Sequence, residues 1–164
     1  MEKELLERAY FASGCFWGTE HYFMKALGVE ATAVGFMGGH IDRPTYGQVC
    51  TKTTGHFETV EVLFDPRYTS YEALVKFFFE THDFSQSNGQ GPDIGPQYRS
   101  VIFYRNVEQK EMAEKYITLL KEIGYCVATA LLPVSTFWKA EENHQQYYKR
   151  SGGEPYCHIY RKIF

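Results

Sequence analysis

The chain has 164 residues, a net charge of -3 and an aromatic content of 17%. This length suits one domain with a substantial core, and we expect a single domain over residues 1–164. The slightly acidic charge and the absence of a long basic run argue against nucleic acid or an anionic membrane as partners. No apolar stretch is long enough to span a bilayer, and the charged N-terminus does not resemble a secretory signal. We therefore expect a cytoplasmic protein.

Periodic apolar residues predict a series of strands and helices along the chain. The strands are expected at residues 8–13, 29–37, 57–64, 98–104 and 127–133. The helices are expected at residues 19–27, 69–81 and 107–123, with shorter helical segments in 46–50 and 140–148. Thr69 and Glu72 have the spacing of a capping box at the start of the second helix, and Gly124 stops the third.

The order of these elements predicts the fold class. Strands and helices follow one another as strand, helix, strand, strand, helix, strand, helix, strand, which places helices on a mixed sheet. We expect an α+β protein, a two-layer α/β sandwich of the ferredoxin-like plait type. From about residue 150 the chain is glycine-rich and lacks periodicity, so we expect a coil-rich, mobile C-terminal arm. The loop at 82–97 is long enough to suggest a functional role.

The first candidate functional residue is Cys15, in the motif Gly14-Cys15-Phe16-Trp17-Gly18. It follows an apolar strand and precedes a helical pattern, so we expect it at or near a helix N-terminus. The positive end of the helix dipole favours a thiolate there, and the thiolate is the reactive form. Phe16 and Trp17 would then line a pocket beside the sulfur, one or both of them. A buried cysteine in a tight turn remains the alternative.

The second candidate is Glu58, which shares a predicted strand face with Val60, Val62 and Phe64. A carboxyl group on an apolar face costs free energy unless it is neutral, paired or at the rim of the sheet. One interpretation is an acid held protonated by an apolar cavity and ready to donate a proton. The other is a structural carboxyl at the end of the strand that reaches water or an arginine.

The remaining cysteines, Cys50, Cys126 and Cys157, form no C-x-x-C pair and no zinc-ligand spacing with Cys15. We therefore expect no metal site and no cofactor. In a cytoplasmic chain they are expected to be free thiols or a redox pair. Cys50 is expected to be a small buried hydrophobe, and Cys126 a buried thiol before a strand.

Several separated blocks of the sequence resemble the A-type peptide methionine sulfoxide reductases. The motif at residues 14–18 is similar to the signature of that family, and further blocks follow in its order and spacing. These blocks are Gly35-Phe36-Met37-Gly38-Gly39, residues 45–50, residues 54–58, His82-Asp83, residues 90–100 and residues 140–147. The resemblance spans residues 9–157. It implies reduction of methionine S-sulfoxide, free or in oxidised proteins, to methionine.

The resemblance also implies a role for each matching residue. Cys15 would attack the sulfoxide sulfur, and Glu58 would protonate the oxygen. Tyr46 and Tyr98 would hydrogen-bond that oxygen, and Asp93 would orient water or polar groups. The substrate would be held by Phe16, Trp17, Gly55 and His56. Cys15 would be left as a sulfenic acid, which condenses readily with a second thiol.

The family often keeps a recycling cysteine in a glycine-rich tail, where this chain has Cys157. The resemblance therefore implies a Cys15–Cys157 disulfide that thioredoxin reduces. Phe36, Phe57, Phe84 and Gly89 depart from the usual family residues. We expect Phe57 and Gly89 to alter the rim of the cavity.

Two other classes of protein stay open at this point. A cysteine hydrolase or acyltransferase would need a histidine base beside Cys15, and the chain has 6 histidines. A non-catalytic thiol redox sensor would use Cys15 and Cys157. Neither class needs Tyr46, Glu58 and Tyr98 together.

Overall fold

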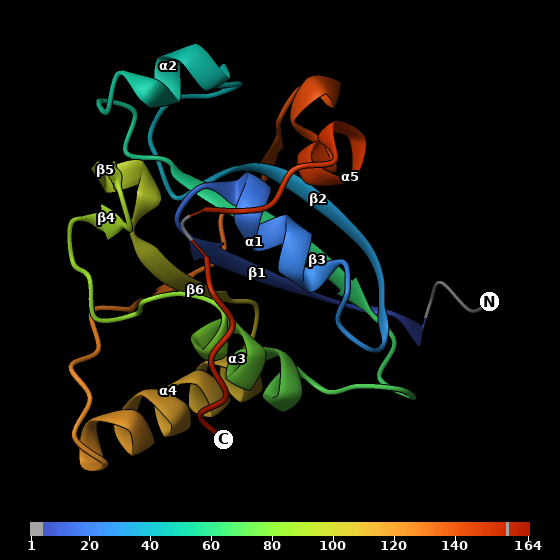
Figure 1. Cartoon of the computed structure of the whole chain (residues 1–164), viewed down its shortest axis with the longest axis vertical. Coiled ribbons are helices and arrows are strands. Elements are labelled where there is room, and N and C mark those ends of the chain that lie inside the picture. The colour runs from blue at the N-terminus through green and yellow to red at the C-terminus, as the bar shows by residue number, and fades with distance from the viewer. Residues whose placement is uncertain (1–4, 157) are drawn as a thin grey trace.

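The computed structural model describes residues 5–156 and 158–164. A six-stranded sheet in the order β7-β6-β1-β3-β2-β8 forms its centre (Figure 1). The strands are β1 (Glu7–Ser13), β2 (Val29–Met37), β3 (Phe57–Phe64), β6 (Ser100–Tyr104), β7 (Ala130–Pro133) and β8 (Trp138–Lys139). The pairs are antiparallel except β6 with β7, so the sheet is mixed, as predicted. A separate ribbon pairs β4 (Gly89–Gln90) with β5 (Asp93–Ile94).

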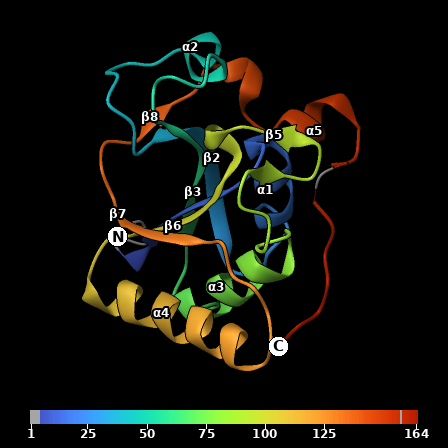
Figure 2. The ribbon, with the colours of Figure 1, turned by 90° about the vertical axis from the view of Figure 1, so that its left-hand side faces the viewer.

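The main helices pack with the sheet around one hydrophobic core (Figure 2). They are α1 (Phe16–Phe23), α3 (Tyr71–Glu80) and α4 (Val107–Glu122). The chain order β1-α1-β2-β3-α3-β6 and the central strand order β6-β1-β3-β2 make a ferredoxin-like plait, which confirms the predicted fold class. Among the described residues, no helix has the length and apolar composition needed to cross a bilayer.

The shorter elements gather at one end of the sheet. They are α2 (Tyr46–Cys50), α5 (Tyr147–Ser151) and the 3-10 turns η2 (Pro96–Tyr98) and η3 (Glu142–His144). Figures 1 and 2 both place α2, α5 and β5 at the end away from α3 and α4. Segments that are distant in sequence therefore meet there.

Alternation along β3 divides its side chains between the two faces of the sheet. Val60 and Val62 belong to the core beneath the helices. Phe57 belongs to a second cluster on the opposite face, where its ring meets Phe103. Glu58 is on the same face as Val60, so a carboxyl group lies on the apolar side of the sheet, as the sequence pattern indicates.

The first helix differs from its predicted range of residues 19–27. It begins at Phe16, because Cys15 is the N-cap residue and its carbonyl accepts hydrogen bonds from the N–H groups of Gly18 and Thr19. It ends at Phe23, and the chain then turns through Gly28 (φ 82) into β2. Leu27, assigned to the apolar stripe, is 79% exposed because it follows the end of the helix.

The helix caps also correct the predicted boundaries. Ser70, not Thr69, caps α3, because its side chain accepts from the N–H of Ala73. The capping box that the structure does contain belongs to α2, where Thr45 and Gln48 bond each other's backbone N–H groups. Gly124 (φ 107) follows α4, as predicted.

The C-terminal arm begins at Gly152, after α5, and contains no regular element in its described residues. It runs past α1 toward α3 and α4 (Figures 1 and 2). The carbonyl of His158 accepts from the hydroxyl of Tyr22, and the N–H groups of Ile163 and Phe164 donate to Glu80. The mobility expected of the arm stays a prediction.

Candidate active site

Cys15 lies where β1 passes into α1, as its motif predicts. It is 8% exposed, with the extended backbone of an N-cap residue (φ -56, ψ 121). The first turn of an α-helix leaves backbone N–H groups without intrahelical partners. These groups and the positive end of the helix dipole favour negative charge at this position. The location therefore suits a thiolate.

Glu58 meets the same helix start from β3. It is 1% exposed, and its Oε1 accepts the N–H of Phe16 at 3.2 Å. Its other oxygen, Oε2, is buried and has no hydrogen-bond partner within the described part of the chain. Burial and, to a smaller extent, the charge of Asp93 together raise the pKa of Glu58 to about 8, against the opposing effect of the Phe16 N–H. The carboxyl group is therefore largely protonated at neutral pH, with one oxygen available to a ligand.

Two phenols approach this carboxyl group from separate elements. Tyr46 begins α2 and Tyr98 ends η2, and both are half-buried. Burial raises the pKa of each phenol, and the nearby Glu58 raises both further. The charge of Cys15 also raises the pKa of Tyr98. The two hydroxyls therefore stay protonated and can donate hydrogen bonds near Cys15 and Glu58.

Asp93 reaches the site from the β4–β5 ribbon, which lies within the predicted long loop. Its charge affects both Glu58 and Tyr98. Its carboxylate accepts the hydroxyl of Tyr156 at 3.1 Å. The ribbon explains Gly89, since a Cβ there would collide with the carbonyl oxygen of Asp93. Gly89 therefore shapes the edge of the site by allowing this close approach of the backbone.

An aromatic wall, which we define as Trp17, Tyr46, His144 and Tyr147, stands beside these groups. Tyr147 stacks on Trp17 with ring centroids 3.9 Å apart, and His144 stacks on Tyr46 at 4.3 Å. The indole N–H of Trp17 donates to Nδ1 of His144 at 3.2 Å. No local pattern in the sequence predicts a role for His144 or Tyr147, although both lie in one of the blocks that resemble the family.

Phe16 and Trp17 do not occupy equivalent positions. Trp17 is half-buried and belongs to the aromatic wall. Phe16 is fully buried and packs against Phe36 and His144, with ring centroids 5.5 and 5.7 Å away. Phe16 therefore supports the wall from behind, and its contact with substrate stays a prediction.

The side chain of His56 hydrogen-bonds the backbone that follows β2. Its Nδ1 accepts the N–H of Gly39 at 3.0 Å, and its Nε2 donates to the carbonyl of Ile41 at 2.7 Å. Both ring nitrogens are therefore used by the loop that leads to α2. Gly55 precedes it in the left-handed region (φ 75) and is exposed. Substrate binding by Gly55 and His56 stays a prediction.

Phe57 does not alter the rim of the site in the way its departure from the family pattern suggests. It is 6% exposed on the face of the sheet opposite Glu58. Its ring packs against Phe103, and the guanidinium of Arg99 lies 5.3 Å from its centroid. Alternation along β3 is the reason, because neighbouring residues point to opposite faces.

The other cysteines differ from expectation. Cys126, expected to be buried, is exposed, because the chain between α4 and β7 is coil up to residue 129. Cys50 is half-buried, so it is not a fully buried hydrophobe. Cys157 lies outside the described residues. Across residues 5–156 and 158–164, no group of three or more His, Cys, Asp or Glu side chains could hold a metal ion.

Comparison with known proteins identifies the family. The family model "Peptide methionine sulfoxide reductase" matches residues 7–164. A peptide methionine sulfoxide reductase from Methanosarcina acetivorans is 51% identical over 152 residues, which cover 91% of this chain and 81% of the relative.

Solved structures agree with this match. The reduced form of Mxr1 from Saccharomyces cerevisiae is 33% identical with a TM-score of 0.89, covering 96% of this chain and 93% of that one. The same yeast protein in complex with Trx2 is 24% identical with a TM-score of 0.64, covering 96% and 91%, and supports the fold alone. The chain belongs to the peptide methionine sulfoxide reductases, and its activity is the thiol-dependent reduction of methionine sulfoxide.

Proposed function

We propose that this protein reduces methionine S-sulfoxide through Cys15 and Glu58, in one domain over residues 1–164. The thiolate of Cys15 attacks the sulfoxide sulfur while Glu58 gives its proton to the oxygen, which is a poor leaving group until it is protonated. A bond forms between the two sulfur atoms. This bond and the substrate's sulfur–oxygen bond then both break as the protonated oxygen is transferred to the sulfur of Cys15. Methionine leaves, and Cys15 remains as a sulfenic acid. The Cys15 thiolate is thereby oxidised, because it loses the two electrons that the sulfoxide gains.

The observation that carries this proposal is Oε2 of Glu58, which is buried and finds no hydrogen-bond partner among the residues that the structure describes. A buried polar atom without a hydrogen bond is costly, so a native protein rarely keeps one without a use. A sulfoxide oxygen bound there would supply the missing partner. The phenols of Tyr46 and Tyr98 are placed to donate to the same oxygen and to stabilise the negative charge that develops on it. Asp93 would act through Tyr98 and Glu58.

The aromatic wall is proposed to hold the S-methyl end of the substrate. Trp17 offers an apolar face that is half-exposed beside the start of α1. Because Phe16 is buried behind it, the wall rests on a packed layer rather than on water. A rigid apolar surface suits a methyl group better than a hydrated sulfoxide oxygen.

Recycling is proposed to use Cys157. Its thiol attacks the Cys15 sulfenic acid, giving a disulfide and water, and thioredoxin then reduces the disulfide. Yeast Mxr1, which is 33% identical to this chain in its reduced form, forms a complex with Trx2, and we take the same kind of partner for this protein. A cytoplasmic location agrees with this chemistry, because that compartment keeps thiols such as Cys50 and Cys126 reduced.

The two other classes considered from sequence fit less well. A cysteine hydrolase needs a histidine base, yet His56 and His82 each use both ring nitrogens on other groups. The two histidines that pack near α1 also bond other groups: His144 accepts the indole N–H of Trp17, and Nε2 of His158 donates to the carbonyl of Ser13. A redox sensor has no use for a buried, protonated carboxyl group beside its cysteine. Membership of the reductase family removes both alternatives.

The proposal is tested by incubating the protein with a small dithiol and a peptide that contains one methionine sulfoxide. Mass spectrometry should show methionine forming from the S epimer, with the R epimer left unchanged. Cys15→Ser should give no product. Product from Cys15→Ser would exclude Cys15 as the nucleophile.

The relay is tested by a single turnover without reductant. The wild-type protein should form a Cys15–Cys157 disulfide, which a non-reducing peptide map would show. Cys157→Ser should still yield one equivalent of methionine and accumulate a trappable sulfenic acid. Normal thioredoxin-driven cycling by this variant would contradict the relay.

A further inference from the structure

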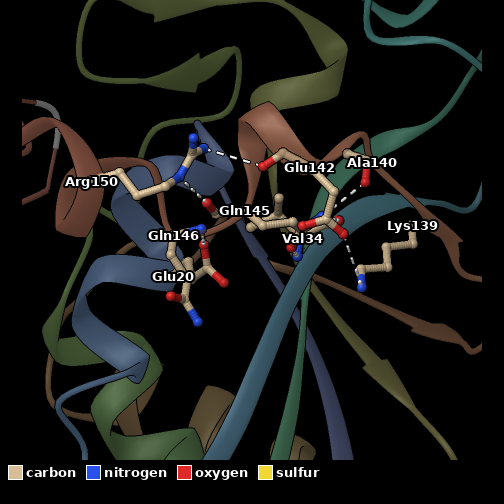
Figure 3. Close-up of polar contacts among 8 residues, drawn as sticks. All are labelled: Glu20, Val34, Lys139, Ala140, Glu142, Gln145, Gln146 and Arg150. Atoms are coloured by element: carbon tan, nitrogen blue, oxygen red, sulfur yellow. Dashed lines mark hydrogen bonds and ion pairs between the residues drawn. The ribbon is translucent and has the colours of Figure 1, made fainter.

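Glu20 is a buried carboxylate that the proposed chemistry does not use. It lies on α1 and is 1% exposed. Its Oε2 accepts the hydroxyl of Thr32 at 2.7 Å. Its Oε1 accepts the backbone N–H of Gln146 at 2.6 Å, the contact drawn in Figure 3. A carboxylate taken out of water is costly unless such donors surround it. Glu20 therefore joins α1 to β2 and to a segment more than a hundred residues away in sequence.

The residue at the far end of this contact has an unusual backbone. Gln146 has φ 53 and ψ 43, the left-handed conformation that a non-glycine residue adopts only when its surroundings hold it. It turns the chain between η3 and α5. The hydrogen bond from its N–H to Glu20 is one of the contacts that stabilise this turn.

The preceding residue is fastened to the sheet. The side chain of Gln145 accepts from the N–H of Val34 at 2.8 Å and donates to its carbonyl at 2.9 Å (Figure 3). Arg150 returns from α5 and donates to the carbonyl of Gln145 at 2.9 Å. The segment is therefore held at two adjacent residues, by β2 through Gln145 and by α1 through Gln146.

The two residues that flank these contacts both belong to the aromatic wall. His144 precedes Gln145, and Tyr147 follows Gln146. Trp17, which both of them contact, lies three residues before Glu20 on the same helix. Residues at this spacing are neighbours on a helix surface, so Glu20 and Trp17 meet the same incoming segment. The turn that Glu20 holds therefore fixes how His144 and Tyr147 approach Trp17.

We propose that Glu20 is a positioning residue for substrate binding, which sets the aromatic wall by holding the Gln146 turn against α1. Its effect on binding rests on the proposed function of the wall. Its effect on the surroundings of Trp17 does not depend on that function. An experiment can therefore contradict the proposed role of Glu20 and the proposed function of the wall separately. Burial raises the pKa of Glu20, while the bonds from Thr32 and Gln146 and the charges of Arg150 and Lys139 lower it.

The test compares Glu20→Ala with Glu80→Ala. Glu80 is the matched control, because it is also a buried carboxylate that accepts backbone N–H groups, but from Ile163 and Phe164 at the chain end. With a methionine sulfoxide peptide and a dithiol, Glu20→Ala should raise KM about tenfold with a smaller change in kcat, the signature of lost binding. Glu80→Ala should lower stability and leave KM unchanged.

Fluorescence gives a readout that does not depend on activity. The chain has 2 tryptophans, so Trp138→Phe leaves Trp17 as the reporter. In that background Glu20→Ala should shift the Trp17 emission to longer wavelength, as Tyr147 and His144 move away, and Glu80→Ala should not. A shift in emission without a change in KM would show that Glu20 positions the aromatic wall but that the wall does not bind substrate.

Two milder variants keep the proposal testable if Glu20→Ala does not fold. Glu20→Gln retains an acceptor oxygen for the Gln146 N–H and should restore most of the wild-type KM. Thr32→Val removes only the hydroxyl that orients Oε2 and should raise KM about twofold. The proposal is overturned if Glu20→Ala and Thr32→Val both keep the wild-type KM and the wild-type Trp17 emission. If Glu20→Ala does not fold, the same result in Thr32→Val alone overturns it.

Discussion

The two halves of the site are built in different ways. Cys15 and Glu58 are fixed by the sheet. Cys15 caps α1 two residues after the end of β1, and Glu58 lies in β3, a strand paired on both sides. His144 and Tyr147 belong to a segment with only short helical turns, held by side-chain hydrogen bonds from Glu20, Gln145 and Arg150. The reacting groups therefore depend on the core, whereas the binding surface depends on a few polar contacts.

The largest expected effect lies in the first half, at Glu58. Glu58→Gln keeps the shape of the side chain but cannot donate a proton, and general acid catalysis contributes about 10²–10⁴-fold. The rate of methionine formation in a single turnover should fall by that factor at neutral pH. The wild-type rate should itself decline above pH 8, where the carboxyl group loses its proton. A wild-type rate in Glu58→Gln would make Glu58 structural.

The same substitution should stabilise the fold, which separates chemistry from structure. The folded-state pKa of Glu58 is raised from 4.5 to about 8, so between these values the folded protein holds a proton that the unfolded chain has lost. Stability from this group is present below pH 4.5 and is lost as pH rises toward 8. Glu58→Gln should therefore be more stable than wild type at pH 8 by more than about 1 kcal/mol. Urea unfolding at two pH values measures this.

The next effect tests the core on which the first half rests. Phe11 in β1 is fully buried and stacks on Phe23 and Phe78, with ring centroids 4.9 and 5.2 Å away. Phe11→Ala should lower the free energy of unfolding by about 3–5 kcal/mol in urea. Leu27→Ala is the control, because Leu27 is 79% exposed, and it should change stability by less than about 0.5 kcal/mol. A large loss of stability in Leu27→Ala would show that Leu27 is buried in the core.

The smallest effect belongs to the binding surface. Tyr147→Ala removes the ring that stacks on Trp17, and an aromatic pair contributes about 0.5–1.5 kcal/mol beyond its buried area. KM for a methionine sulfoxide peptide should rise about two- to tenfold, with stability nearly unchanged. Tyr68→Ala, which removes an exposed tyrosine that follows the far end of β3, should leave KM as it is. An equal KM in both variants would show that Tyr147 does not contribute to substrate binding.

Sequence reasoning located the first half of the site and missed much of the second for a physical reason. Cys15 and Glu58 stand out locally, one in a strand-to-helix motif and the other as the single acid on an apolar strand face. Glu20, His144 and Tyr147 act through contacts that span more than a hundred residues, and the segment around residue 145 has no periodicity to place it. Glu20 also lay inside a helix whose predicted start was three residues too late.

The errors at exposed positions have a similar origin. Leu27 and Cys126 were assigned to buried elements because they are apolar or adjoin an apolar run. The structure places Leu27 after the end of α1 and Cys126 in coil before β7. Periodicity gives the direction of a side chain only while the element continues, and its end depends on turns such as the one at Gly28.

The central claim is that Glu58 is a protonated acid at neutral pH, and titration of isotope-labelled glutamate carboxyl carbons by NMR tests it most directly. The account predicts one carboxyl group with a pKa near 8, whose signal is missing in Glu58→Gln. Burial raises the pKa of Glu20 as well, so this comparison with Glu58→Gln makes the assignment. If the signal that disappears in Glu58→Gln titrates near the ordinary glutamate value of about 4.3, Glu58 is ionised at neutral pH and cannot be the proton donor.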